Sequence, residues 1–458
     1  MRASWTLRAA VIAATVGLTL LSAPPAAAIA PPVIDPAALP PDVTGPEPDR
    51  PLEQRKACME AFATPGANFV DPQWSQRYLQ LAEAHKWSTG KGVLVAVLDT
   101  GVRPSPRVPA EPGGDFITAD GDGLTDCDAH GTLVASLIAG RPHPGDAFVG
   151  VAPDARILSL RVTSEAFSPS GVQQDPNDPN QTQPAASVRT LARAIVHAAN
   201  LGARVINISL TACIKASDKI NQDSLGAAVR YAVVERDAVV ISASGNQNEG
   251  GLGGTCTQNP LPTAANTSDP FGWNGVVTIV TPAWYTPLVV SVGAITEAGQ
   301  PTSFSMTGPW VSAAAPGERS VALFNDAPVN ARPGDEGPVD LNGTSFSSAY
   351  VAGVAALIRE KYPNLTANQV IDRLLRTARH PGEGRNNVVG YGPSDALAAL
   401  TWDVPLGPQL PSFPTRQLPP PPPPFEPDRR PVTYVLITVA GTVVLAGATW
   451  LIRRALRR

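Results

Sequence analysis

Residues 92–101 read Gly92-Val-Leu-Val-Ala-Val-Leu-Asp-Thr-Gly101. An unbroken apolar run of this kind, with glycine before it and an aspartate at its end, is typical of a strand buried on both faces of a sheet. Similar runs follow at 156–162, 205–210, 238–242 and 288–293, and helical apolar spacing occurs at 187–200 and 223–235. This alternation predicts an α/β fold with a parallel sheet flanked by helices.

Asp99 ends the first predicted strand, at the carboxyl edge where open α/β sheets form their sites. An ordinary turn aspartate is the plain alternative. An Asp-Thr-Gly triplet is also half of an aspartic peptidase site, but that chemistry requires a second copy or a symmetric dimer. The sequence contains no second copy.

His130 begins the segment His130-Gly-Thr-Leu-Val-Ala-Ser-Leu-Ile-Ala-Gly140, whose apolar residues repeat every four positions. We therefore expect a buried helix that starts at the histidine. An imidazole at this place can face a cleft and exchange protons near neutral pH. The other histidines lack such a context and are interpreted as surface or core residues: His85, His143, His197 and His380.

Ser345 lies in Gly343-Thr-Ser-Phe-Ser-Ser-Ala-Tyr-Val-Ala-Gly353, where a second apolar helix is expected to begin. A serine here is either a helix cap or a nucleophile whose own backbone N–H faces a developing oxyanion. The Gly-x-Ser-x-Gly motif of α/β-hydrolases is absent, because Ser347 stands where its second glycine would be.

These segments together resemble the subtilisin-like peptidase family, whose catalytic residues occur in the order Asp, His, Ser. The matching motifs are Asp99-Thr-Gly101, His130-Gly-Thr132 and Gly343-Thr-Ser-Phe346. The resemblance implies a serine endopeptidase with a subtilisin-like fold. No cofactor or metal site is expected. In such an enzyme Ser345 would attack the peptide carbonyl, His130 would transfer the proton and Asp99 would orient the imidazole.

The same resemblance implies further site residues. Ser244-Gly-Asn246 matches the segment that carries the family's oxyanion asparagine, so Asn246 is expected to donate its side-chain amide to the tetrahedral intermediate. Extended substrate is expected to pair with Ser209, Leu210 and Thr211. The first specificity pocket is expected to be walled by Ala243, Ser244 and Gly245.

The two ends of the chain carry targeting signals. Arg2, Arg8, the apolar run 9–21 and small residues up to Ala28 predict a secretory signal peptide. Residues 433–452 carry no charge and are long enough to cross a bilayer as a helix, and the arginines that follow predict a cytoplasmic C-terminus. We thus expect a single-pass type I protein of the cell membrane with its catalytic domain on the extracytoplasmic side.

The predicted organisation follows from these signals and from the distribution of proline. The parts are a signal peptide (1–28), a proline-rich N-terminal extension (29–80), a peptidase domain (81–402), a proline-rich linker (403–432), a transmembrane helix (433–452) and a basic tail (453–458). Long stretches expected to be irregular interrupt the domain at 164–186, 247–287 and 320–342.

The four cysteines of this exported chain predict disulfides, for which sequence alone allows three pairings. We favour Cys58 with Cys127 and Cys213 with Cys256. A zinc half-site at Cys127 and His130 is the alternative, but a second ligand pair at zinc-like spacing is missing.

Charge gives two further expectations. The net charge of −4 provides no positive field for a nucleic-acid partner, so none is expected. An acidic stretch lacks the spacing of an EF-hand loop, and we interpret it as a solvated loop, with a calcium site as the open alternative. Its members are Asp115, Asp120, Asp122, Asp126 and Asp128.

Almost the whole chain is similar to the mycosins, the membrane-anchored subtilisin-like proteases of type VII secretion systems. The similarity rests on the signal peptide, the extension, Cys127-Asp-Ala-His-Gly-Thr132, the long loops, the linker and the anchor. It implies exported protein substrates, association with a membrane secretion complex, and an N-terminal extension that wraps the domain and stays attached. Two alternatives stay open: a structural subunit in which proteolysis is secondary, and a general scavenging protease, against which the anchor argues.

Overall fold

The computed structural model describes residues 29–42, 46–171, 187–218, 220–247, 255–262, 268–413 and 430–456. The predicted signal peptide (1–28) and residues 414–429 of the predicted linker lie outside these ranges. The chain forms two compact units, Met1–Arg416 and Gln417–Arg458.

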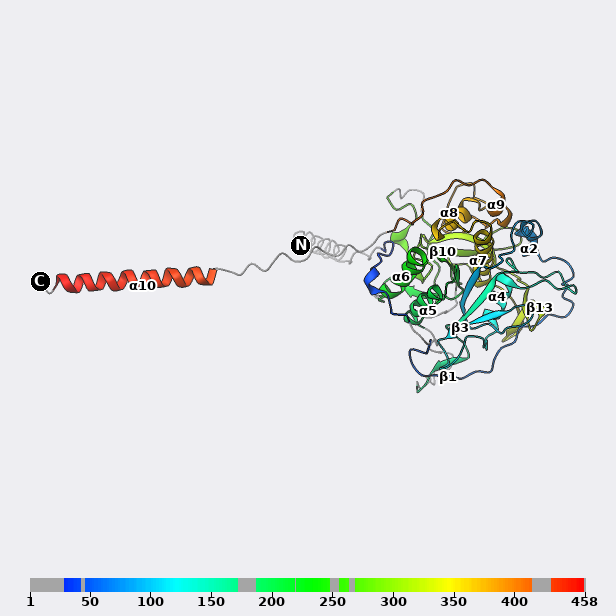
Figure 1. Cartoon of the computed structure of the whole chain (residues 1–458), viewed down its shortest axis with the longest axis horizontal. Coiled ribbons are helices and arrows are strands. Elements are labelled where there is room, and N and C mark those ends of the chain that lie inside the picture. Colours follow the sequence, from blue (N-terminus) through cyan, green and yellow to red (C-terminus); the bar gives the residue numbers. More distant parts are fainter. Residues whose placement is uncertain are drawn as a thin grey trace, which may run out of the picture. The chain divides into compact units, whose positions relative to one another are not determined.

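A seven-stranded parallel sheet forms the centre of the larger unit (Figure 1). Its strand order is β11-β10-β8-β6-β2-β4-β3, and every neighbouring pair is parallel. The strands are β2 (Leu94–Asp99), β3 (Ala110–Asp115), β4 (Arg156–Arg161), β6 (Val205–Ile208), β8 (Val239–Ala243), β10 (Val289–Ile295) and β11 (Val311–Pro316). The predicted parallel sheet is confirmed, and each of the predicted strands belongs to it.

The two edge strands, β3 and β11, were not predicted. β3 contains Pro112, Gly113 and Gly114, and β11 is built largely of alanine, so neither has the long branched apolar run that marks a central strand. Tertiary pairing with β4 and β10 makes these segments strands despite their weak local preference.

Helices cover the sheet as the spacing predicts. The longer ones are α4 (His130–Ala139), α5 (Val188–Asn200), α6 (Asp223–Arg230), α7 (Thr344–Lys361) and α8 (Ala367–Arg376); shorter ones are η1 (Pro36–Ala38), α2 (Trp74–Tyr78), α3 (Leu81–Ala84), η3 (Trp273–Gly275) and α9 (Ala396–Thr401). The predicted helix 223–235 changes to a π-helical turn over its last residues, η2 (Tyr231–Glu235).

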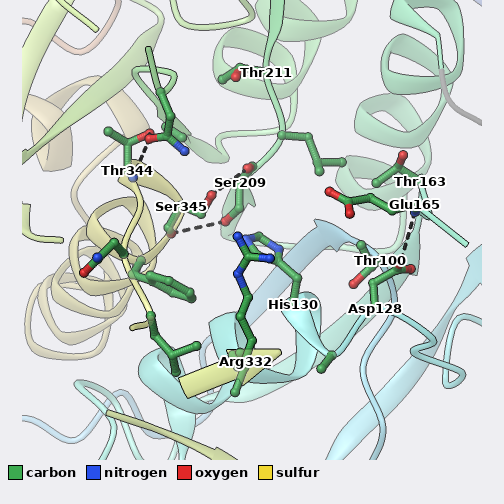
Figure 2. A pocket seen from close by; sticks show the side chains of 18 of the residues that line it. Thr100, Asp128, His130, Thr163, Glu165, Ser209, Thr211, Arg332, Thr344 and Ser345 are labelled. Carbon is green, nitrogen blue, oxygen red and sulfur yellow. Dashed lines mark hydrogen bonds between the residues drawn. The ribbon is translucent and has the colours of Figure 1, made fainter. Parts of the chain in front are cut away.

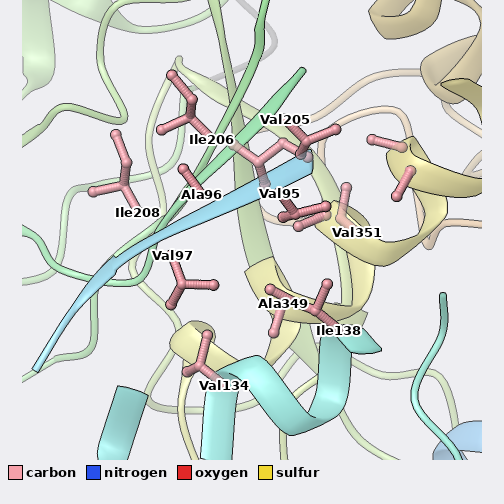
Figure 3. Close-up of a cluster of buried hydrophobic side chains, with 14 of the residues drawn as sticks. Val95, Ala96, Val97, Val134, Ile138, Val205, Ile206, Ile208, Ala349 and Val351 are labelled. Carbon is pink, nitrogen blue, oxygen red and sulfur yellow. The ribbon is translucent and has the colours of Figure 1, made fainter. Parts of the chain in front are cut away.

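The core lies between the sheet and the helices that carry the candidate site residues. In Figure 3, Val95 and Val97 of β2 lie on the side of α4 and α7, close to Val134 and Ala349, whereas Ala96 points the opposite way. All of these side chains are fully buried. Because successive side chains of a strand alternate between faces, β2 is apolar on both faces and holds the start of α4 and α7 against the carboxyl edge of the sheet.

The stretch 320–342 is not irregular, so that prediction is wrong. It forms two hairpins, β12 (Ala322–Phe324) with β13 (Ala327–Val329) and β14 (Ala331–Gly334) with β15 (Gly337–Asp340). The first hairpin turns at Asn325 and Asp326, whose φ angles are 50° and 62°. Two such residues form the tight turn that connects short antiparallel strands.

The other two stretches also contain strands in their described parts. Within 247–287, β9 (Thr278–Thr281) pairs antiparallel with β7 (Ala212–Lys215). Within 164–186, β5 (Phe167–Pro169) pairs antiparallel with β1 (Leu52–Gln54) of the N-terminal extension. Residues 172–186, 248–254 and 263–267 lie outside the described part of the chain.

Both predicted disulfides form, joining Cys58 to Cys127 and Cys213 to Cys256. The first ties the extension to the segment just before α4. The extension also contacts α5, where Asp49 bonds to Arg193 and Asp42 lies 2.8 Å from the amide nitrogen of Asn200. Figure 1 shows its described part running along the larger unit as the blue segments. The extension is therefore held by a covalent bond, a strand pair and polar contacts.

The interpretation of the acidic stretch as a solvated loop is wrong for three of its members. Asp115, Asp126 and Asp128 are at least 93% buried and accept hydrogen bonds from backbone or hydroxyl donors. Their donors include residues far away in sequence, which explains why composition alone suggested solvent exposure. Within the described ranges, no group of three or more His, Cys, Asp or Glu side chains is arranged to hold a metal ion.

The smaller unit contains α10 (Arg430–Ala455), which includes the predicted span 433–452. Across the residues that the structure describes, no helix has both the length and the apolar character that crossing a membrane requires. Four positions of the predicted span, 433–435 and 437, have side chains outside that description.

Candidate active site

A cleft of about 370 Å³ opens at the carboxyl edge of the sheet (Figure 2). Its lining includes His130 at the start of α4, Ser345 at the start of α7, and Ser209 and Ala243 at the ends of β6 and β8. Polar side chains from distant parts of the chain thus lie together at the carboxyl edge of the central sheet, as expected for an α/β fold.

Asp99 and His130 form a direct contact. The Nδ1 atom of His130 lies 2.6 Å from Oδ1 of Asp99, which also accepts a hydrogen bond from the backbone N–H of Thr100 at 2.8 Å. Asp99 is fully buried, whereas the His130 side chain keeps 31% of its exposure. The buried carboxylate therefore orients the imidazole and holds the proton on Nδ1, so Nε2 is the nitrogen that can exchange a proton.

Ser345 is 8% exposed, and its hydroxyl donates a hydrogen bond to the carbonyl oxygen of Ser209 at 3.1 Å. Phe346 lies beside the imidazole of His130, with ring centroids 5.7 Å apart. The serine proton must leave the Ser209 carbonyl before it can pass to His130. In this arrangement the Ser345 hydroxyl is therefore held by the Ser209 carbonyl.

The amide of Asn246 is oriented by the residue before Ser345. Its Oδ1 accepts hydrogen bonds from the backbone N–H of Thr344 at 3.0 Å and from the Thr344 hydroxyl at 2.9 Å. A Cβ atom added to Gly343 would lie 3.5 Å from Nδ2 of Asn246 and 3.8 Å from the backbone nitrogen of Ser345. The two nitrogens therefore border one small space, as two donors to an oxyanion must.

Gly343→Ala is expected to fill this space and to lower kcat by at least about 10², the cost of losing one oxyanion donor. Gly343 has φ 155°, so the new side chain also strains the backbone. Initial rates on a short peptide measure the effect. Gly382→Ala is the matched control, because a Cβ there meets no atom within 4 Å. Equal loss in both variants would contradict the assignment of the space.

The environment of His130 shifts its proton affinity. Burial alone would lower the pKa of His130, but the charge and hydrogen bond of Asp99, with the charges of Asp126 and Glu165, outweigh it and raise the pKa to about 9. Burial also raises the pKa of Asp126, to about 6, although hydrogen bonds from Thr132 and Thr100 oppose the shift.

We expect kcat/KM to rise with pH through a midpoint above 7, because only neutral His130 can accept the serine proton. Glu165→Gln removes one of the charges that raise the pKa of His130, and should move the midpoint to lower pH. A pH–rate profile centred below pH 6.5 would contradict this prediction.

The stability of the fold changes with pH in the opposite direction. Protonated His130 stabilises the fold fully below about pH 6.5, and this contribution is lost as pH rises through about 9.

The structure brings most of the predicted site residues together. Those that line the cleft are His130, Ser345, Asn246, Ser209, Leu210, Thr211 and Ala243, with Asp99 buried behind His130. Ser244 and Gly245 are buried and lie outside this lining. Of the predicted pocket wall, only Ala243 therefore faces the cleft.

Sequence reasoning missed part of the cleft wall. Met59 and Ala61 of the extension line it, as do Glu165 and Arg332. The pairing of Cys58 with Cys127 was a usable signal for the first two, since it places residues 59–61 near His130. Arg332 had no such signal, because its position depends on the β14–β15 hairpin.

Comparison with known proteins agrees with this geometry. A sequence model of the subtilase family matches residues 90–392. The chain is 59% identical over 445 residues to Mycosin-1 of Mycobacterium tuberculosis (strain ATCC 25618 / H37Rv), which covers 97% of this chain and 98% of that protein.

Solved structures give the same result. The crystal structure of MycP1 from the ESX-1 type VII secretion system is 57% identical, with a TM-score of 0.80, and covers 85% of this chain and 100% of that one. A chain of an intact ESX-5 inner membrane complex is 46% identical, with a TM-score of 0.77, and covers 92% and 99%.

Proposed function

The chain belongs to the subtilase family and, within it, to the mycosins, and we propose that Asp99, His130 and Ser345 form its catalytic triad. It is a subtilisin-like serine protease. The observation that carries the assignment is the 2.6 Å contact of His130 with buried Asp99 in the same cleft as Ser345.

The proposed reaction is two-step acyl transfer. Ser345 Oγ attacks the scissile carbonyl while His130 Nε2 takes its proton, and His130 then gives this proton to the leaving amine. Water hydrolyses the acyl-enzyme by the same route in reverse order. Asn246 Nδ2 and the Ser345 backbone N–H donate to the oxyanion, and the Thr344 contacts keep the amide in the required orientation.

We propose that the acyl side of the substrate binds in extended form along Ser209, Leu210 and Thr211, which follow β6 and line the cleft. Ala243 borders the first side-chain pocket. Extended peptides commonly bind by pairing with exposed backbone, with side-chain pockets adding specificity.

A fluorophosphonate probe tests the triad directly, since it reacts with an activated serine. We expect covalent labelling of the folded ectodomain at Ser345, located by peptide mass spectrometry. Folded protein that stays unlabelled would favour the alternative of a structural subunit, and labelling at another serine would refute Ser345 as the nucleophile.

We further propose that the protease cleaves exported proteins while bound to a type VII membrane secretion complex. The similarity to a chain of an intact ESX-5 inner membrane complex supports this partner. A purely structural role is the second candidate, and it is compatible with the same partner. Co-purification of the two from membranes tests the association.

We propose that a signal peptide at 1–28 is removed. Residues 433–452 then anchor the chain in the membrane. The support comes from the sequence: an uncharged run of 20 residues, followed at once by Arg453 and Arg454. Deletion of residues 433–458 should release a soluble ectodomain that still cleaves peptides. Retention of the deleted protein in washed membranes would contradict the proposal that this segment anchors the chain.

A further inference from the structure

Two charged side chains of opposite sign face the cleft. Glu165 and Arg332 are both exposed and both line it, and Figure 2 shows them entering from different walls, Glu165 beside Thr163 and Arg332 from the β14–β15 hairpin. Among the described residues, neither side chain forms a hydrogen bond or an ion pair. Unpaired charges in a substrate cleft are available to a substrate.

The position of Glu165 is fixed relative to His130. Asp128, two residues before the histidine, accepts hydrogen bonds from the Ser164 hydroxyl at 2.6 Å and from the backbone N–H of Glu165 at 2.8 Å. The carboxylate of Asp128 is therefore used to hold the 164–166 segment. The Glu165 carboxylate is left to face the cleft, and it is close enough for its charge to raise the pKa of His130.

The N-terminal extension connects the two walls that carry these charges. The backbone N–H of Arg55 donates to the carbonyl of Ala166 at 2.7 Å, next to Glu165. Seven residues later, the N–H of Phe62 donates to the carbonyl of Ala331 at 2.9 Å, next to Arg332. With the Cys58–Cys127 bond between these contacts, one short segment sets the position of both walls.

We propose that Glu165 and Arg332 determine substrate specificity by charge: Glu165 binds a basic side chain before the scissile bond, and Arg332 binds an acidic side chain after it. The sides follow from the sheet. Glu165 follows β4 and the Ser209–Thr211 segment follows β6, and both strands pair with β2, whereas Arg332 enters from β14 on a different wall (Figure 2). This inference rests on the proposed function of the triad and of the Ser209–Thr211 segment.

The test is a set of peptides that share one cleaved sequence. Lys, Gln or Glu is placed in turn at each of three positions before and three positions after the bond, and kcat/KM is measured at one pH. Wild type should prefer Lys to Gln about fivefold at one position before the bond and Glu to Gln about fivefold at one position after it, the size expected of a partly exposed ion pair. Because each ratio compares two substrates of the same enzyme, an altered pKa of His130 cancels.

Variants assign each preference to its residue. Glu165→Gln should reduce only the first ratio to about one, and Glu165→Lys should invert it; Arg332→Gln and Arg332→Glu should do the same to the second ratio. The controls, Glu336→Gln on the same hairpin and Arg189→Gln at the start of α5, remove exposed charges outside the cleft and should change neither ratio.

The outcomes separate the two levels of inference. Wild type that cleaves the peptides without regard to charge, or Glu165→Gln and Arg332→Gln variants that keep the preferences, would overturn the charge assignment and leave the triad intact. Folded wild type that cleaves none of the peptides would overturn the proposed function and this inference with it.

Discussion

Ser345→Ala is expected to lower kcat by about 10⁶, because it removes the nucleophile and leaves only binding and the oxyanion donors, as loss of the serine does in subtilisin. The substitution deletes one hydroxyl whose described bond, to the Ser209 carbonyl, is a single contact at 3.1 Å. The fold should therefore survive. Progress curves on a peptide substrate and the melting temperature, measured on the same preparation, separate the two effects.

Ser348→Ala is the matched control. Ser348 lies one turn further along α7, is fully buried and donates its hydroxyl to the carbonyl of Ser345 at 2.8 Å. Removing that hydroxyl costs this contact and a longer one to Ser209 Oγ at 3.3 Å but leaves the Ser345 hydroxyl in place, so kcat should stay within about tenfold. If both variants lost activity equally, Ser345 would be a structural serine rather than the nucleophile.

The Ser345→Ala variant also separates proteolysis from assembly. Association with a secretion complex would use outer surfaces of the protein, which the deletion of a cleft hydroxyl leaves unchanged. Ser345→Ala should thus still co-purify with the complex while processing of substrates stops. A folded variant that no longer joins the complex would contradict this separation.

The central sheet and the residues at its carboxyl edge could be predicted because the signals are local. A run such as 93–98 identifies a buried strand by itself, and the motifs around Asp99, His130 and Ser345 lie directly at element ends. Edge strand β3, with its glycines and proline, has no such signal and depends on its pairing with β4.

The walls of the cleft could not be predicted for the same reason. Arg332 reaches the cleft through a hairpin whose first strand is held by a hydrogen bond between Ala331 and Phe62, which are 269 positions apart in the sequence. From the sequence, Asp128 was expected in a solvated acidic loop. In the structure it is buried, and its carboxylate accepts hydrogen bonds from Ser164 and Glu165. The walls of this cleft thus depend on long-range contacts, whereas the residues proposed for the chemistry lie at the ends of regular elements.

Asp99→Asn is expected to lower kcat by about 10⁴ with little change of KM, because an amide in place of the carboxylate favours the wrong tautomer of His130. The carboxylate is fully buried and lies 2.6 Å from Nδ1, so the amide that replaces it stays beside the imidazole. A second consequence distinguishes this effect from a general structural defect. The charge of Asp99 is the largest influence that raises the pKa of His130, and its loss should move the midpoint of the kcat/KM profile to lower pH.

Asp126→Asn provides the comparison. Asp126 is also buried, but its carboxylate accepts hydrogen bonds from the hydroxyls of Thr100 and Thr132 at 2.9 and 2.6 Å rather than contacting the imidazole. It raises the pKa of His130 only through its charge. Its loss should therefore shift the pH profile in the same direction while kcat at the new plateau stays within about tenfold of wild type. Because only Asp99 touches Nδ1, a similar loss of plateau kcat in both variants would show that buried negative charge, and not control of the tautomer, is what this site requires.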